Sequence, residues 1–417
     1  MTRKIRRLLV TVLAVLLLGG CWSYRELDET AWVMALGIDK GRENLLTVTA
    51  QVAVPKAIAG GAGGGGVGGG GGGGGNQTVS TVSMDAPTLL SALELLNAFF
   101  DRRADLSHAK IVVFSRDLAE EGLGDLLAPL ARFRQFRRTT AILIAQERAE
   151  KLIKEINPIL EDNPVKFYEL LTGGWKYTEF IPYDTFYELY NNSKSYGISP
   201  VAVLAGLQEK EKGPPDPTYK PKGSYIAGHI PRTGGVKLEL MGGAVFRGDR
   251  MAGTINGDEL GIVKMLRGDM KHTIISAKDP RHPREFIVVR VTPRQAAEVR
   301  VDPAEVPRVT AVIRLEGDIL SIQSGEEYDS PARIPELERA VEAMLQRDAA
   351  RVITRAQQDF RADIFGFGEK AKKHFPTWQA WTGYDWHNRF PEAEISVIID
   401  FKVRRIGLLH ETVPVRR

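Results

Sequence analysis

The 417-residue sequence contains almost no cysteine, and Cys21 is the single one. One thiol excludes a disulfide framework within the chain, and no Cys/His cluster has the spacing of a zinc site. The seven histidines are scattered, and the sequence lacks HExxH, GxSxG, P-loop and CxxC patterns. We therefore expect no metal, no cofactor and no catalysis, although paired carboxylates far apart in the sequence could still meet in the fold.

The chain also lacks an excess of charge over most of its length. The first seven residues hold four of the 56 basic residues, and no acidic residue precedes position 21. The remainder therefore balances 52 basic residues against 52 acidic ones. A neutral body does not favour nucleic acid as a partner.

No apolar run is long enough to cross a membrane. The run LLVTVLAVLLL at 8–18 has eleven residues, whereas a spanning helix needs about 20. A basic start followed by a short apolar run is typical of a signal peptide, which we predict over residues 1–20. The run ends in Leu18-Gly19-Gly20-Cys21, which resembles the lipobox of bacterial lipoproteins. The alternative is a chance cysteine after an ordinary signal peptide.

The lipobox resemblance implies a role for Cys21. In bacterial lipoproteins a diacylglyceryl group is attached to this thiol, and cleavage makes the cysteine the new N-terminus. One acyl chain gives only marginal membrane binding, whereas two or three hold a protein stably. We expect the mature protein to be tethered to a membrane through Cys21 without spanning it.

Residues 21–200 predict an N-terminal domain of α/β type. Strand-like segments at 31–39 and 45–54 predict a hairpin, and alternating strands and helices over 77–155 predict a mixed sheet with flanking helices. We expect Asp85 to cap a helix that runs to about residue 101, and a second helix over 117–131. The tract at 60–75 has fourteen glycines in sixteen residues and predicts a flexible loop rather than a phosphate cradle.

The second half of the chain has a different pattern. Residues 201–235 are rich in Pro, Gly and charge, and we interpret them as a linker or the start of a middle domain. Residues 236–410 predict a C-terminal α+β region in which one long helix, about 335–363, packs on an antiparallel sheet. Turns are expected at 242–243 and 248–249. The fold class is thus α+β and multi-domain, with a division of 236–410 into two domains left open.

An aromatic cluster and two tripeptides are candidate binding features. Five aromatic residues interleaved with lysine could bind nucleic acid or carbohydrate, but we favour packing of the long helix onto the sheet. They are Trp378, Trp381, Tyr384, Trp386 and Phe390. The tripeptide RGD occurs at 247–249 and 267–269, and at the first position we interpret it as a hairpin turn rather than an adhesive motif.

Four stretches, in order along the chain, carry a family resemblance. They are GCWSYRELDETAWVMALGIDKG (20–41), FFDRRADLSHAKIVVFS (99–115), GGAVFRGDRMAGTINGDELGIVKMLRG (242–268) and QQDFRADIFGFGEKAKKHFPTW (357–378). Together they resemble the Ger(x)C spore germination lipoproteins, the C subunits of germinant receptors in endospore-forming bacteria. Two departures are the absence of an acidic residue soon after Trp22 and the long glycine tract.

The resemblance implies a non-enzymatic, three-domain α+β protein on the outer face of the spore's inner membrane. Such subunits act with two integral-membrane germinant-receptor subunits in nutrient-triggered germination. The family offers no settled ligand pocket, so contact with a small-molecule germinant stays open. The alternatives are a solute-binding lipoprotein of a transporter, which would have two similar α/β lobes, and an envelope hydrolase, which would need a nucleophile or a metal cluster.

Overall fold

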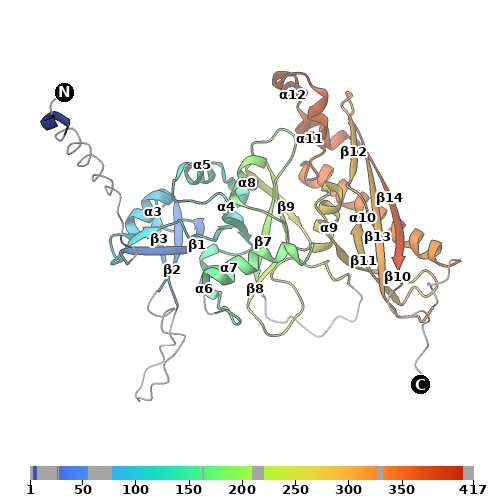
Figure 1. The fold of residues 1–417 in the computed structure, drawn as a ribbon, viewed down its shortest axis with the longest axis horizontal. Helices are drawn as coiled ribbons and strands as arrows, with labels where there is room; N and C mark the ends of the chain where they lie inside the picture. The colour runs from blue at the N-terminus through green and yellow to red at the C-terminus, as the bar shows by residue number, and fades with distance from the viewer. Residues whose placement is uncertain are drawn as a thin grey trace, which may run out of the picture.

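The computed structural model describes residues 3–6, 26, 28–54, 78–161, 164–208, 220–326, 328 and 332–406. Within them the chain forms a nine-stranded and a five-stranded sheet, which lie toward opposite ends of an elongated molecule (Figure 1). Helices accompany both sheets, so the predicted α+β class is confirmed.

The first sheet is mixed, as predicted. Its strands are β1 (Thr30–Lys40), β2 (Leu46–Ala53), β3 (Val79–Ala86), β4 (Arg103–Asp105), β5 (Ile111–Ser115), β6 (Ala141–Ala145), β7 (Val201–Leu207), β8 (Leu238–Arg247) and β9 (Arg250–Ile255). The order is β3-β2-β1-β5-β6-β7-β8-β9, and β4 pairs with β1. The four neighbours β1, β5, β6 and β7 run parallel, and antiparallel hairpins flank them on both sides.

Helices cover both faces of this sheet. They are α3 (Leu89–Leu96), α4 (Arg116–Glu121), α5 (Gly124–Arg132), α6 (Ala149–Glu155), α7 (Pro164–Thr172) and α8 (Phe186–Asn192), with a 3₁₀ turn, η2 (Gly173–Lys176). Successive residues of β5 point to opposite faces. Val112 and Phe114 therefore enter one core with α3, α4, α5 and α8, and Ile111 and Val113 enter the other with α6 and α7.

Two helix predictions in this region were wrong in detail. The helix expected over 117–131 is broken into α4 and α5 at Gly122, whose φ of 127° interrupts the helical backbone. The cap of α3 is Thr88, which forms a capping box with Ser91. Asp85 remains in β3 and accepts hydrogen bonds from the backbone N–H groups of Arg42 and Glu43 in the β1–β2 turn.

The second sheet contains β10 (Thr273–Lys278), β11 (Phe286–Pro293), β12 (Glu298–Asp302), β13 (Arg308–Ile322) and β14 (Glu394–Arg405). The first four strands pair antiparallel, as predicted, but β14 pairs parallel to β13. A parallel neighbour requires a crossover connection, which here includes the long helix α10 (Ile334–Arg355). The buried face of α10 comprises Leu337, Val341, Leu345, Ala349 and Val352.

Strand β8 differs from the expected pair of turns. It runs through Gly242-Gly243 as one strand, and its pairing with β7 shifts at this point, so the glycines form an irregularity in the strand. The turn expected at 248–249 is present between β8 and β9, with Gly248 at φ 64°. Helix α9 (Gly257–Arg267) follows β9 and leads to the second sheet.

Strand β7 opens the segment 201–235, and it pairs with β6 before the segment and with β8 after it, so the first sheet continues across this segment. This segment therefore does not separate the two sheets, and the division of the chain into domains stays a prediction. The predicted glycine-rich loop at 60–75 and residues 209–219 lie outside the described residues.

Replacing Asp85 with Asn should lower stability at neutral pH but not in acid. The hydrogen bond from the Thr47 hydroxyl, and then that from the Glu43 backbone, lowers the pKa of Asp85 from 3.8 to about 2. A carboxyl whose folded pKa is depressed stabilises the fold above its unfolded pKa, and this contribution is lost as the pH falls from about 4 to about 2. Because Asp85 is solvent-accessible, we expect a loss of only about 1 kcal/mol near pH 7.

Urea denaturation of Asp85→Asn across this pH range measures the effect. Asp101→Asn, an exposed carboxyl with no recorded partner among the described residues, is the control and should be neutral. A destabilisation of Asp85→Asn that is independent of pH would contradict the prediction.

Candidate functional site

The segment after α10 is organised by one buried carboxylate. Asp363 is fully buried, and its oxygens accept hydrogen bonds from the backbone N–H groups of Phe365, Gly366 and Gly368 at 2.8–3.0 Å. The indole Nε1 of Trp386 donates a fourth hydrogen bond at 2.9 Å. Burial raises the pKa of Asp363, and the four donors oppose this effect. The carboxylate thus closes the FGFG segment into a fixed loop.

This loop joins the two halves of the molecule. The backbone N–H of Ser199, just before β7, donates to the carbonyl of Asp363 at 2.8 Å. Ser195 donates to Glu369 at 2.8 Å, and the His387 ring lies 2.8 Å from the Ser195 carbonyl. Residues that precede a strand of the first sheet are therefore held against the segment that leads to β14.

Close backbone approach explains one glycine of the motif. A Cβ on Gly368 would lie 2.5 Å from the Trp386 ring and 2.6 Å from backbone atoms of Gly197. Such distances are below van der Waals contact, so a larger residue would push the two segments apart. Gly368 of the FGFGE motif is therefore required by packing at this joint.

After α11 (Phe367–Ala371) and η4 (Lys372–His374), the five residues of the aromatic cluster lie in α12 (Trp378–Tyr384), α13 (Trp386–Arg389) and η5 (Phe390–Glu392). Trp381, Trp386 and Phe390 are buried, which confirms the packing interpretation for these three rings. Trp378 is 54% exposed, and its ring lies edge-on to Tyr196 at 5.5 Å. This exposed ring belongs to the same joint, because Tyr196 precedes β7.

The second RGD tripeptide is part of the joint. The Nε of Arg267 donates to the carbonyl of Ile364 at 2.6 Å, and its Nη2 atom is buried. Nearby Asp184 is buried as well, and burial strongly raises the pKa of that carboxyl. Arg267 is therefore not available to an adhesion partner.

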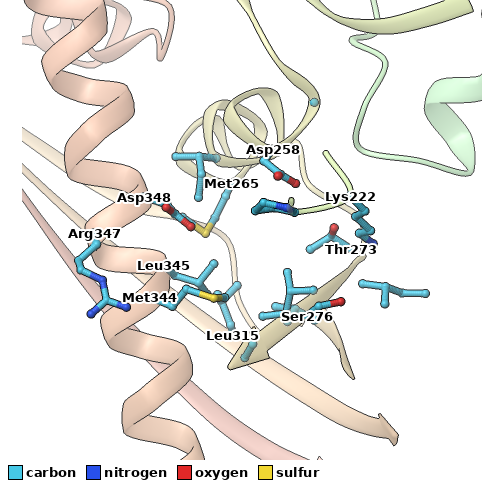
Figure 2. Close-up of a pocket in the computed structure, with 18 of the residues that line it drawn as sticks. Lys222, Asp258, Met265, Thr273, Ser276, Leu315, Met344, Leu345, Arg347 and Asp348 are labelled. Carbon is cyan, nitrogen blue, oxygen red and sulfur yellow. The ribbon is translucent and has the colours of Figure 1, made fainter. Parts of the chain in front are cut away.

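A pocket of about 500 Å³ lies between α9, α10 and β10. Figure 2 shows the apolar side chains of Met265, Met344 and Leu315 between the helices and the sheet. The same view places Lys222 on the side opposite Asp348. The lining thus combines an apolar wall with charged groups of both signs.

The charged groups of the pocket perturb one another. Burial raises the pKa of Asp258, and the negative charge of Asp348 raises it further. Burial also raises the pKa of Asp348, which is 3.1 Å from Arg351 in an ion pair. Burial lowers the pKa of Lys222. These residues could hold a small molecule that carries an apolar body and a charged group.

Sequence reasoning missed this pocket. Its lining comes from six segments spread over residues 180–351, and no two of its charged residues form a motif. The partial signal was the family-like stretch 242–268, which contains Asp258 and Met265. Within the part of the chain that the structure describes, no group of three or more His, Cys, Asp or Glu could hold a metal ion.

The predicted lipid-attachment residue, Cys21, lies outside the described residues, as does nearly all of the predicted signal peptide. Its role therefore stays a prediction. Among the described residues the structure contains no helix with the length and apolar character needed to cross a membrane.

Two family models match the chain, one after the other. "Spore germination protein N-terminal domain" matches residues 23–206, and "Spore germination B3/GerAC like, C-terminal" matches residues 241–407. Both describe spore germination proteins, and together they cover most of the sequence. The chain belongs to the Ger(x)C family of spore germination proteins.

Individual proteins agree with this assignment. Spore germination protein KC of Bacillus subtilis (strain 168) is 25% identical over 421 residues, which cover 98% of this chain and 97% of the relative. Spore germination protein YndF of the same organism is 22% identical over 97% of each chain. The crystal structure of the GerBC protein has the same fold, with a TM-score of 0.52 at 14% identity over 88% of this chain and 96% of that one.

Asp363→Asn should destabilise the protein by about 3 kcal/mol or more, because an amide NH₂ would face buried N–H donors and leave them unsatisfied. Asp359→Asn, which removes only a surface ion pair with Arg355, should cost less than about 0.5 kcal/mol. Urea denaturation compares the two variants. Equal stability of Asp363→Asn and the unchanged protein would disprove the role of this carboxylate.

Proposed function

We propose that this chain is the lipid-anchored C subunit of a membrane-associated germinant receptor. In this proposal it assembles with two integral-membrane subunits and contributes to nutrient-triggered germination on the outer face of the spore's inner membrane. The observation that carries the proposal is the family match over 23–206 and 241–407, directly after a lipobox that ends at Cys21.

The proposed role is structural and regulatory rather than catalytic. The family-like stretch around Asp363 serves as a packing joint, and every hydrogen bond that the Asp363 carboxylate accepts comes from the protein itself. A rigid joint between two sheets suits a subunit that presents surfaces to partners.

The transporter alternative has less support. A solute-binding lipoprotein would consist of two similar lobes, whereas the two sheets here differ in strand number and in topology. The pocket in Figure 2 lies between α9, α10 and the second sheet rather than between two lobes of one type. We retain the receptor-subunit role.

Cys21→Ala tests the anchor. We expect the variant to lose labelling by a radioactive fatty acid and to leave the membrane fraction, because the thiol that accepts the lipid is gone. Ser23→Ala, outside the lipobox, is the matched control and should label normally. A Cys21→Ala variant that still labels and still sediments with membranes would refute the anchor.

A pull-down from detergent-solubilised spore membranes tests the assembly. With this chain as bait, we expect to recover two multi-spanning membrane proteins identified by mass spectrometry. Recovery of a transporter permease and its ATPase would support the solute-binding alternative instead. Recovery of no multi-spanning protein would argue against the receptor subunit.

A further inference from the structure

The loop between α5 and β6 carries an unusual concentration of arginine. Residues 132–138, here called the arginine loop, contain Arg132, Arg134, Arg137 and Arg138, all of them exposed. Across the described part of the chain, none of these four side chains has a recorded ion pair or hydrogen bond. A chain whose body is otherwise neutral thus presents four uncompensated positive charges in seven residues.

The backbone of the arginine loop is fixed. Phe136 is buried and its ring lies edge-on to Phe186 at 5.0 Å. The N–H of Thr140 donates to the Arg137 carbonyl at 3.1 Å, and the N–H of Tyr187 donates to the Arg138 carbonyl at 3.0 Å. The guanidinium groups therefore extend from a preorganised loop, which reduces the entropy that binding must overcome.

The surroundings are also basic. Arg137, His108 and Lys110 line a hollow of about 210 Å³ next to the loop. Burial lowers the pKa of His108, and the positive charge of Arg137 lowers it further. The one acidic residue in this lining, Glu169, pairs with Lys110 at 3.3 Å rather than with the arginine loop. Asp105 also acts on His108 and opposes the lowering of its pKa, but the residues that line the hollow comprise three basic side chains and one acidic one.

The arginine loop lies at the end of the first sheet where its parallel strands β1, β5 and β6 begin, here called the entry end. Hydrogen bonds run from the N–H of Lys110 to the carbonyl of Met34 in β1, and from the N–H of Ala141 to the carbonyl of Lys110. The loop that leads into β6 is therefore two strand spacings, about 10 Å, from β1. Acidic Glu26, Asp28 and Glu29 also lie at this entry, but no ion pair joins them to the arginine loop.

The sequence limits how far this end can be from the proposed anchor. Thr30 is the ninth residue after Cys21, and a fully extended chain spans at most about 3.3–3.6 Å per residue, or roughly 30 Å here. A lipid on Cys21 would thus keep the arginine loop within reach of the bilayer surface. Arginine forms bidentate hydrogen bonds with phosphate, the group that phospholipid headgroups carry.

We propose that the arginine loop docks onto the anionic phospholipid surface of the membrane that holds the chain. The loop then orients the protein, with the entry end of the first sheet toward the bilayer and the second sheet away from it. The placement of the loop rests on the proposed lipid anchor, whereas its affinity for anionic lipid does not.

Vesicle binding by the unlipidated protein tests the loop separately from the anchor. The protein used is the chain that begins at position 21 with Cys21→Ser, which keeps every element from β1 to β14. We expect it to sediment with vesicles of phosphatidylglycerol and phosphatidylcholine and not with pure phosphatidylcholine. Each basic residue near such a surface contributes about fivefold in partitioning, and salt weakens the effect.

The decisive comparison is between two quadruple variants of equal charge. R132Q/R134Q/R137Q/R138Q should lose at least a hundredfold in vesicle binding, on the order of fivefold per arginine. R284Q/R290Q/R300Q/R339Q removes four exposed arginines from the second half of the chain and should bind as the unchanged sequence does. Equal binding by both variants, or equal loss in both, would overturn the proposal.

Three further readouts complete the test. In the lipidated protein, hydrogen exchange of residues 132–139 should slow on anionic vesicles, and an unchanged rate would overturn the proposal without any variant. Competition by millimolar inorganic phosphate at constant ionic strength, or tighter binding of a DNA duplex than of vesicles, would identify another anion as the partner and also overturn it. Failure of Cys21 labelling with intact vesicle binding would refute the anchor alone.

Discussion

The structure depends on one buried carboxylate. Asp363 follows α10 and the π-helical turn Ala356–Phe360 that continues it. Its carboxylate accepts four hydrogen bonds, three from backbone N–H groups that follow it and one from Trp386. A buried charge is costly unless its hydrogen bonds are fully satisfied, and here the chain supplies them by folding tightly around it. Because Ser199 also donates to the Asp363 carbonyl, the same residue connects the segment before β7 with the segment before β14. The relative position of the two sheets follows from this joint.

The walls of the pocket are carried by α9 and α10, and both helices are held by contacts outside the pocket. At the C-terminal end of α9, Arg267 donates to Ile364, and near its start Glu259 pairs with Arg355 of α10 at 2.6 Å. The pocket between these helices is therefore held open by contacts outside its own lining. Helix packing brings Asp258 of α9 close to Asp348 of α10, and the segment before β8 adds Lys222.

The two ends of the molecule have different surface chemistry. The entry end of the first sheet carries the arginine loop and follows the proposed lipid anchor, while the second sheet carries paired charges such as those of Arg308 with Glu394 and Arg404 with Glu316. The arginine loop concentrates four exposed arginines within seven residues, whereas the exposed arginines of the second half, such as Arg284 and Arg339, are spread along the chain. For a receptor subunit tethered at one end, this distribution would leave the second sheet and its pocket for contact with partners or solutes.

The sequence by itself determined the local features. Apolar runs bounded by turn residues specified the β1–β2 hairpin and the buried strands β5 and β6, and the helical repeat of Leu337, Val341 and Leu345 specified α10, because these patterns report which faces are buried. The family motifs and the lipobox are also local. Tertiary structure decided what depends on distant partners: Asp85 binds a turn forty residues away instead of capping a helix, β14 joins β13 in parallel, and Asp258 faces Asp348. It also decided that Asp363, one acid among 52 in the sequence, is buried, because a carboxylate's role is set by the donors that the fold brings to it.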